Sequence, residues 1–458
     1  MTYFITGIDL VLIILYFGLI LGIGSSFSKK IANRAVRSYF MKGLALKLVC
    51  GLGFGWVYVY YYGGGDTTMY FRGASVIYDQ VIGQGNGLDV FFNDYLLASL
   101  ISGSDSKLFT YRFAGFLNFF SFNSYWACTL LFSFLSFLGM WLIFQSFYRI
   151  YPRLYKPLAI AALFVPGVAF WSAGIMKDSI CMLFVGVVVY FIQNIFIFGR
   201  QKILSACLVA IGFYVLITLK AYIAMALLVA LALYALLALK SRIKNKAARI
   251  VAIPLLAVSI FAIAAFTLNE IGQSLERYSL ENIVETAQTY QGYHTRTSTA
   301  DRRGNAVRTG SSYNLGEINF NSPVSIVSKI PAAINVTFFR PYVWEVTNPV
   351  MLLSALESLI ILIFTLKVIR RTGIGRFFKL LVSYKEVLFC ISFALIFGFA
   401  VGFTTYNFGS LVRYKAPCIP FFLIALVLIN DLPVKKKAST QKRIRRMPVQ
   451  PAIQRLPS

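Results

Sequence analysis

The sequence predicts an all-α, polytopic integral membrane protein, and three observations lead to that fold class. First, 58% of the 458 residues are hydrophobic and only 13% are charged, which is more apolar surface than a soluble chain buries. Second, the apolar residues fall in stretches of the length that crosses a bilayer as a helix, about 20 residues. Third, most of the charges lie between these stretches. Soluble enzymes are therefore excluded.

Eleven stretches are long enough to span a bilayer as helices. We expect them at residues 7–24, 44–62, 125–147, 157–173, 178–198, 203–219, 221–240, 249–268, 349–369, 386–406 and 411–430. Only Lys220 separates the sixth from the seventh, and the fourth contains Pro166. Residues 1–24 have neither a basic leading region nor a small-residue cleavage site, so we interpret them as a retained span.

The distribution of charge orients these spans. Most of the 44 lysines and arginines follow odd-numbered spans or lie in the C-terminal tail, and the positive-inside rule places such segments in the cytoplasm. The N-terminus is then outside, and residues 63–111 and 269–348 form two large external loops, which also hold twelve of the 17 acids. We predict a single transmembrane domain, residues 1–432, whose external loops roof a cavity. A basic cytoplasmic tail, residues 433–458, follows it.

The composition also argues against several ligands. The net charge of +27 raises the question of nucleic acid, but no zinc-finger, RNA-recognition or basic-zipper pattern is present, and the topology explains the basic excess. The six cysteines are scattered through apolar stretches without a Cys-x-x-Cys pair, so neither a zinc site nor a disulfide framework is indicated. We expect no nucleic-acid partner, no metal and no cofactor.

A glycine-rich motif follows the second span. Three glycines precede Asp66, and Tyr70 and Arg72 follow it. Glycines permit backbone conformations closed to other residues and a close approach of a ligand, so Asp66 is a candidate catalytic carboxylate and its two neighbours are candidate substrate-binding residues. The alternative is that Asp66 only caps the helix that starts there; the two interpretations are compatible.

Two further cations lie where spans begin or meet. Lys177 and Asp178 open the fifth span at its outer edge, and Lys220 lies at the outer turn between the sixth and seventh. The lysines are candidate ligands for a lipid phosphate, and Asp178 is a candidate substrate-binding residue. The alternatives are helix capping by Asp178 and snorkelling of the two lysines.

The second external loop contains a polar segment at residues 293–322. Its ionisable residues include the lone histidine, His294, and four arginines, Arg296, Arg302, Arg303 and Arg308. Arginine binds phosphate and carboxylate in a bidentate manner, so Arg296 and its neighbours are candidate phosphate ligands and His294 is a candidate general base. A solvated basic loop is the alternative.

Two aromatic and basic segments complete the outer surface. In the first, residues 338–345, Arg340 is a candidate phosphate ligand, and Trp344 and Glu345 are candidate substrate-binding residues; an ordinary aromatic girdle is the alternative. In the second, at the outer end of the last span, two cations can straddle a diphosphate. That segment contributes the candidate phosphate ligands Arg413 and Lys415 and the candidate substrate-binding Tyr414.

Three of these motifs, taken in order, resemble those of a known family. They are Gly-Asp-x-x-x-Tyr at Asp66 and Tyr70, the cation-bearing segment at Lys177 and Asp178, and Arg-Tyr-x-x-Pro at Arg413 and Tyr414. Together they resemble the EpsG/Wzy-type polysaccharide polymerases, within the GT-C-like polytopic membrane glycosyltransferases. The resemblance covers about thirty residues. The paired acids common in the first outer loop of GT-C enzymes are absent here, which argues against a divalent metal.

The resemblance implies a glycosyltransferase of the bacterial cytoplasmic (inner) membrane. Its donor is a sugar linked to polyprenyl phosphate or diphosphate, its acceptor is a glycan, lipid or protein, and transfer takes place on the outer face among membrane lipids. The cations would neutralise the leaving phosphate, and Asp66 would orient or deprotonate the acceptor hydroxyl. The alternative is a flippase or exporter of an anionic lipid or glycan, which calls for ionisable residues deep in the bundle and broken helices.

Overall fold

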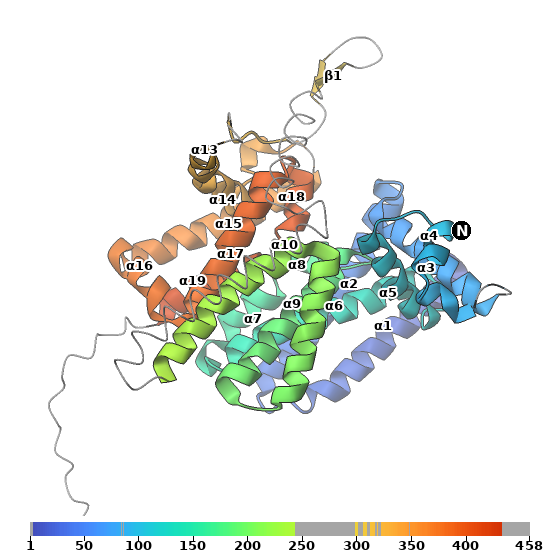
Figure 1. Ribbon diagram of the computed structural model, residues 1–458, viewed down its shortest axis with the longest axis horizontal. Helices are drawn as coiled ribbons and strands as arrows, with labels where there is room; N and C mark the ends of the chain where they lie inside the picture. Colours follow the sequence, from blue (N-terminus) through green and yellow to red (C-terminus); the bar gives the residue numbers. More distant parts are fainter. Residues whose placement is uncertain are drawn as a thin grey trace, which may run out of the picture.

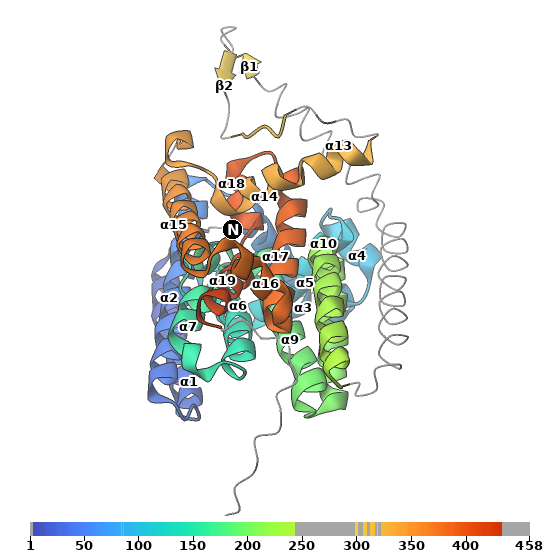
Figure 2. The same ribbon diagram turned by 90° about the vertical axis from the view of Figure 1, so that its left-hand side faces the viewer.

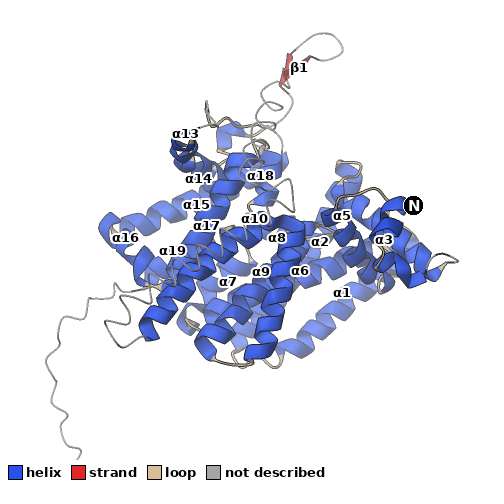
Figure 3. Cartoon of the chain, in the orientation of Figure 1, coloured by secondary structure: helices blue, strands red, loops and turns tan. Residues whose placement is uncertain are grey.

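The computed structural model describes residues 3–83, 85, 87–242, 298–300, 306–308, 312–316, 318, 322–347 and 349–432. Figure 3 shows that this part of the chain is almost wholly helical. The first elements are α1 (Gly7–Ser28), α2 (Arg34–Trp56), η1 (Val57–Tyr61), α3 (Asp66–Ile82), η2 (Gly87–Phe91), α4 (Asp94–Leu100), α5 (Asp105–Phe119), α6 (Tyr125–Tyr148), η3 (Pro152–Leu154), α7 (Tyr155–Leu163), α8 (Pro166–Trp171), α9 (Lys177–Gln193), η4 (Asn194–Phe198) and α10 (Lys202–Arg242).

The later elements are β1 (Ser298–Ala300), β2 (Ala306–Arg308), α13 (Pro323–Ser328), α14 (Ile330–Phe339), η5 (Val343–Glu345), α15 (Pro349–Thr372), α16 (Ile374–Ser383), α17 (Lys385–Thr404), α18 (Phe408–Tyr414) and α19 (Ile419–Asp431). The two short strands pair antiparallel, with Ser298 opposite Arg308. Figure 1 shows the N-terminal helices (blue) and the C-terminal helices (orange to red) on opposite sides of α6, α9 and α10.

Among the described residues, seven helices are long and apolar enough to cross a membrane. They are Gly7–Ser28, Arg34–Tyr61, Tyr125–Tyr148, Lys177–Phe198, Lys202–Ala238, Met351–Thr372 and Lys385–Thr404. An eighth candidate is the pair α18 and α19, which is bent by 64°. The predicted helical, polytopic character is confirmed; the expected span at 249–268 and the tail at 433–458 lie outside the described residues.

Besides the bend within the expected span at 411–430, the structure differs from the expected spans at two further places. The fourth span, 157–173, is two short helices, because Pro166 has no N–H to continue α7 and instead starts α8. The sixth and seventh spans form the single element α10, whose backbone is non-helical at Lys220 (φ −152°, ψ 78°). Figure 1 shows the two green arms of α10 meeting at an angle.

The core is built where helices lie backbone to backbone. A Cβ atom added at Gly139 of α6 would collide with the Met182 carbonyl of α9, and one added at Gly186 would collide with the Gly139 carbonyl. Small residues allow such close packing of helices in membranes. Figure 2 shows α6 in the middle of the molecule, with α1 and α2 on one side and α10 on the other.

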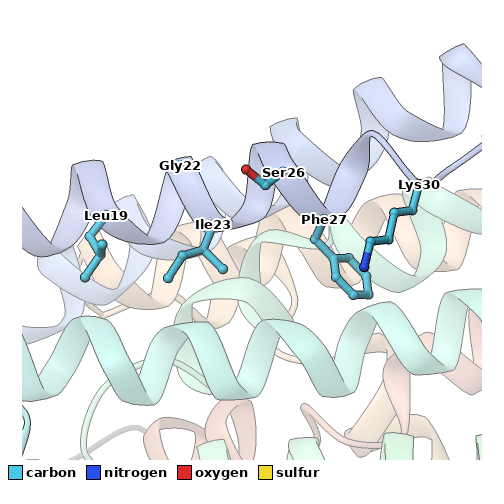
Figure 4. A pocket seen from close by; sticks show the side chains of 6 residues that line it. All are labelled: Leu19, Gly22, Ile23, Ser26, Phe27 and Lys30. Atoms are coloured by element: carbon cyan, nitrogen blue, oxygen red, sulfur yellow. The ribbon is translucent and has the colours of Figure 1, made fainter.

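Helix α1 presents an apolar surface to the outside of the bundle. A shallow pocket on it is lined by Leu19, Gly22, Ile23, Ser26, Phe27 and Lys30. Figure 4 shows the leucine and isoleucine side chains on this face and the Lys30 chain reaching toward Phe27, with its ammonium 6.0 Å from the centre of that ring. Exposed apolar side chains with a lysine at the helix end are typical of a lipid-facing helix.

The expected external loop at residues 63–111 is largely helical. Helices α3 and α5 pack against each other, and the Tyr111 ring occupies the space that a side chain at Gly73 would need. Helix α5 also contacts α10 and α6, so this segment belongs to the bundle. It brings the start of α3 close to α9 and α18, which the next section describes.

Candidate functional site

Four charged residues from four separate elements meet at one place. Asp66 is the first residue of α3, Asp178 lies in the first turn of α9, Lys220 lies at the break in α10, and Arg413 lies in the short helix α18. Each therefore lies at a helix end, at a break or in a short helix, where backbone groups lack intrahelical partners. We call these four residues the ion chain.

The ion chain alternates acid and base. The Arg413 guanidinium donates from Nη1 to Oδ2 of Asp66 over 2.9 Å, and from Nε to Oδ2 of Asp178 over 2.7 Å. The other oxygen of Asp178 accepts a hydrogen bond from the Lys220 ammonium. Both oxygens of Asp178 are therefore occupied by cations, and one arginine bridges the two carboxylates.

Burial increases from Asp66 to Asp178, which lies between Arg413 and Lys220 and is the most deeply buried of the four residues. The exposed fraction of the side chain is 44% for Asp66, 14% for Arg413, 9% for Lys220 and 1% for Asp178. A buried carboxylate is tolerated only when it is paired and hydrogen-bonded, and Asp178 has both a lysine and an arginine. The Arg413–Asp66 pair lies nearer solvent, where an ion pair contributes about 1 kcal/mol or less. The outer contact is thus the one that an arriving anion can replace.

Aromatic rings line the ion chain. The Tyr414 ring centre lies 4.6 Å from the Lys220 ammonium and 5.5 Å from the Arg413 guanidinium, distances typical of cation–π contacts. On the α3 side, the Tyr70 ring lies 5.8 Å from the Lys177 ammonium. Burial, reinforced by the nearby Asp66 carboxylate, raises the pKa of Tyr70, so its hydroxyl stays protonated at neutral pH.

Helix capping does not explain Asp66. The N-cap of α3 is Gly65, and Thr68 bonds back to it: its hydroxyl accepts from the Gly65 N–H over 3.0 Å and lies 2.8 Å from the Gly65 carbonyl. All three glycines before the helix have positive φ values, from 70° to 145°, which only glycine adopts without strain. The carboxylate of Asp66 is therefore free to point at Arg413.

Lys177 has a different partner from the one expected for a phosphate ligand. Its ammonium donates to the hydroxyl of Ser106 over 2.7 Å and so connects the start of α9 to the start of α5. Because serine is neutral, the positive charge of Lys177 is not cancelled by this contact. It therefore adds a cation beside Tyr70 at the edge of the ion chain.

A second polar cluster surrounds Arg340, after α14. Two nitrogens of its guanidinium bind the Glu345 carboxylate, with Nε 3.1 Å and 3.0 Å from the two oxygens, and its guanidinium carbon lies 5.1 Å from the Phe408 ring. Burial opposes the charge on Glu345, but the hydrogen bonds from Arg340 and the Tyr342 N–H hold its pKa below the usual range. Trp344 stacks on Tyr342 and is otherwise exposed.

Lys415 lies beneath this cluster and is almost fully buried. Its ammonium donates to the Ser358 hydroxyl over 3.0 Å and to the Arg340 carbonyl over 3.3 Å. On the neighbouring turn of α15, Glu357 accepts a hydrogen bond from the Gly167 N–H at the start of α8. Lys415 thus contacts protein groups in this structure, so its predicted role as a phosphate ligand is not supported by its position.

Several predicted site residues do not join either cluster. Arg72 is exposed on α3. His294, Arg296, Arg302 and Arg303 lie outside the described residues, and Arg308 is described only as part of β2. The part of the chain that the structure describes contains no group of three or more His, Cys, Asp or Glu residues that could hold a metal ion.

Sequence reasoning missed one buried cation near the site. Lys47, counted among the basic residues of the cytoplasmic side, lies inside α2 and is 1% exposed. Its ammonium donates to the Ala169 carbonyl over 2.9 Å and to the Ser172 hydroxyl over 2.6 Å, at the end of α8. No charge pattern reveals this, because the acceptors are a backbone carbonyl and a hydroxyl at the C-terminal end of the short helix α8.

The arrangement can bind an anion and accept a proton at neighbouring points. Arg413 presents a guanidinium whose outer partner is replaceable, with Lys177 and Lys220 adding positive charge, and Asp66 is a carboxylate that solvent reaches. Comparisons of the chain with models of protein families, with characterised proteins and with solved structures find no match.

Proposed function

We propose that this protein is a membrane glycosyltransferase of the polymerase type, which uses sugar donors linked to polyprenyl phosphate or diphosphate. Transfer takes place on the outer face of the cytoplasmic membrane, with the N-terminus on that side. The observation that carries the proposal is the ion chain: the three motifs of the family resemblance lie up to 347 residues apart, yet Arg413 donates hydrogen bonds to both Asp66 and Asp178.

In the proposed mechanism, the donor phosphate takes the place of Asp66 on Arg413. The inner contact to Asp178 holds the guanidinium in position, because the Asp178 side chain is only 1% exposed and its contact with Nε is short, at 2.7 Å. Lys177 and Lys220 supply further positive charge as the phosphate leaves. Once the phosphate has displaced it from the arginine, Asp66 would be available as a base beside the bound donor.

The bond changes balance within the site. The acceptor hydroxyl oxygen forms a bond to the anomeric carbon, and the bond between that carbon and the phosphate oxygen breaks. The electron pair leaves with the polyprenyl phosphate or diphosphate, and the hydroxyl proton moves to Asp66. Tyr414, which is partly exposed, provides a ring face for the sugar, and the buried Tyr70 supports the site from the α3 side.

The test is a transfer assay in proteoliposomes with a synthetic polyprenyl-diphosphate oligosaccharide. We expect Asp66→Asn to lower the rate by at least 100-fold, the lower range for a general base, while the protein level and donor binding are retained. Asp105→Asn is the matched control, because Asp105 is also the exposed first residue of a helix in the same segment. Equal rates for the Asp66 variant and the wild type would exclude the catalytic role.

The second candidate is a flippase or exporter of an anionic lipid or glycan, and specific observations favour it. Helices are broken at Pro166, at Lys220 and between α18 and α19. Three buried lysines, Lys47, Lys220 and Lys415, lie within the described part of the bundle. Broken helices and buried charge are features of transporters.

One experiment separates the two functions. Proteoliposomes are loaded with a fluorescent polyprenyl-phosphate sugar, and both the accessibility of the label and the size of the glycan are followed. A transferase lengthens the glycan in wild-type vesicles, and Asp66→Asn abolishes that change. Movement of the label across the bilayer without any change in glycan size would instead establish transport.

A further inference from the structure

A groove of about 650 Å³ lies between α3, η2 and α5, and none of its lining residues belongs to the ion chain. Its wall is almost entirely apolar and consists mainly of phenylalanines. Phe116 and Phe120 lie at one end and are more than half exposed. Grooves of this size and character are typical of sites for ligands with a large apolar part.

One cation, Arg112, lines this groove. Its Nη1 lies 2.6 Å from Oδ1 of Asp94, whose side chain is 71% exposed. The other two nitrogens, Nε and Nη2, are buried and have no hydrogen-bond partner among the described residues. Buried donors without an acceptor are rare and costly, and a guanidinium edge with two adjacent donors suits a phosphate.

The two ends of the groove lie in different surroundings. The carbonyl of Phe120 accepts a hydrogen bond from the hydroxyl of Tyr16, which lies nine residues beyond Gly7, about 14 Å along the axis of α1. Because most of α1 is exposed and apolar, Phe120 lies at the depth of a lipid-facing helix. Asp94, beside Arg112, has a charged side chain that is 71% exposed, which places the other end of the groove at a polar surface.

We propose that this groove binds one glycerophospholipid of the surrounding bilayer that carries an anionic headgroup. Its phosphate contacts Nε and Nη2 of Arg112, and one acyl chain follows Phe116 toward Phe120. The apolar wall excludes a small soluble anion, and the unpaired donors exclude a purely hydrocarbon ligand. This site is separate from the ion chain and does not depend on the proposed glycosyl transfer.

The test uses the purified full chain in detergent micelles, delipidated and then titrated with phosphatidylglycerol that carries a diazirine in one acyl chain. After illumination, mass spectrometry maps the adducts. We expect them on peptides within residues 81–120. Arg112→Gln should lower adduct formation there about tenfold, because a charge-assisted hydrogen bond to phosphate is lost.

The matched variant is Asp94→Asn, which we expect to change the adduct yield in the opposite direction. Asp94 pairs with Nη1 of Arg112 and repels an anion at the two neighbouring nitrogens, so removing its charge should raise the yield severalfold. Phe116→Ala shortens the wall at an exposed position and should lower the yield, and it carries the test if Arg112→Gln does not fold.

Two results would overturn the proposal. One is an equal adduct yield in Arg112→Gln, Asp94→Asn and the wild type, which would make the arginine a structural residue only. The other is complete displacement of the labelled lipid by an equimolar amount of polyprenyl phosphate, which would assign the groove to that lipid and not to a phospholipid. Inorganic phosphate at the same concentration should leave the yield unchanged.

Discussion

Two arginines meet at α18, and their partners come from very different places in the chain. Arg340 binds Glu345, five residues later, and lies against Phe408 at the start of α18. Arg413, within α18, binds Asp178 and Asp66, which precede it by 235 and 347 residues. The first pair is local and partly exposed, and the second joins three elements around a fully buried carboxylate.

The Arg340–Glu345 pair stabilises a local turn, whereas the ion chain holds together distant elements at the candidate site. The Arg340 pair can form as soon as its own segment folds, because Glu345 also accepts the Tyr342 N–H over 2.8 Å. The ion chain exists only when α3, α9, α10 and α18 are all in place. Buried ion pairs are weak evidence for stability, since desolvation offsets their attraction, whereas buried and charged clusters are concentrated at functional sites.

The largest effect is expected from Arg413→Gln. It leaves Asp66 without its cation and removes one of the two cations on Asp178, and breaking a buried pair on one side costs about 3–5 kcal/mol. Arg340→Gln is the matched control, and its partly exposed pair should cost about 1 kcal/mol or less. Melting temperatures of both variants in the same detergent measure the difference. Equal losses of melting temperature would mean that the long-range network contributes no more to stability than the local pair.

A double-mutant cycle on Asp178 and Lys220 should give the next largest effect. Asp178→Asn leaves two cations facing each other without a carboxylate between them, so it should destabilise more than Lys220→Met, after which Arg413 still pairs with Asp178. The double variant should be more stable than Asp178→Asn alone, because it also removes Lys220, the cation that Asp178→Asn leaves without a carboxylate, while Arg413 keeps Asp66. We expect a coupling of about 1–3 kcal/mol.

The cycle is measured by denaturation in mixed micelles, with the four proteins in one detergent. Additive losses would show that Lys220 and Asp178 do not stabilise each other. In that case the contact between the Lys220 ammonium and Asp178 would not explain the break in α10 at Lys220. Tyr414, which lies 4.6 Å from that ammonium, would be the next partner to test.

Much of this fold follows from sequence because membrane helices are long and uniform. Apolar length alone identified α1, α6, α9 and α17, since their backbone hydrogen bonds must be satisfied internally in lipid. Breaks were harder to place. Pro166 was noticed within an expected span, but the sequence did not show that two short helices would form there. The carbonyl of Ala169, near the end of the second helix, accepts from Lys47, 122 residues earlier, and no local pattern indicates such a contact.

The sequence predicted the individual residues of the candidate site, but it did not predict which of them contact one another. Asp66, Asp178, Lys220 and Arg413 were each singled out as charges at the ends of apolar stretches, which is where charge in a membrane protein usually has a role. Their pairing depends on the packing of four elements, and no local pattern encodes it. The same reasoning expected Lys415 on the phosphate, whereas the bend between α18 and α19 accompanies its burial against Ser358.

The smallest expected effect is the pH dependence of the stability that the local Arg340–Glu345 pair contributes. The pKa of Glu345 is held below the usual range despite burial, chiefly by Arg340 and the Tyr342 N–H. A carboxyl whose pKa is depressed by folding contributes stability above the pKa of the unfolded chain, about 4.3 for glutamate, and loses it as the pH falls through the folded value. The wild type should therefore melt slightly higher than Glu345→Gln at pH 7, by an amount corresponding to about 1 kcal/mol or less.

At about pH 3, well below the pKa of glutamate in the unfolded chain, this difference in melting temperature should shrink toward zero. A difference that persists there would mean that Glu345 acts through its shape and packing and not through its charge, and the contrast with Asp178 would then lie in burial alone.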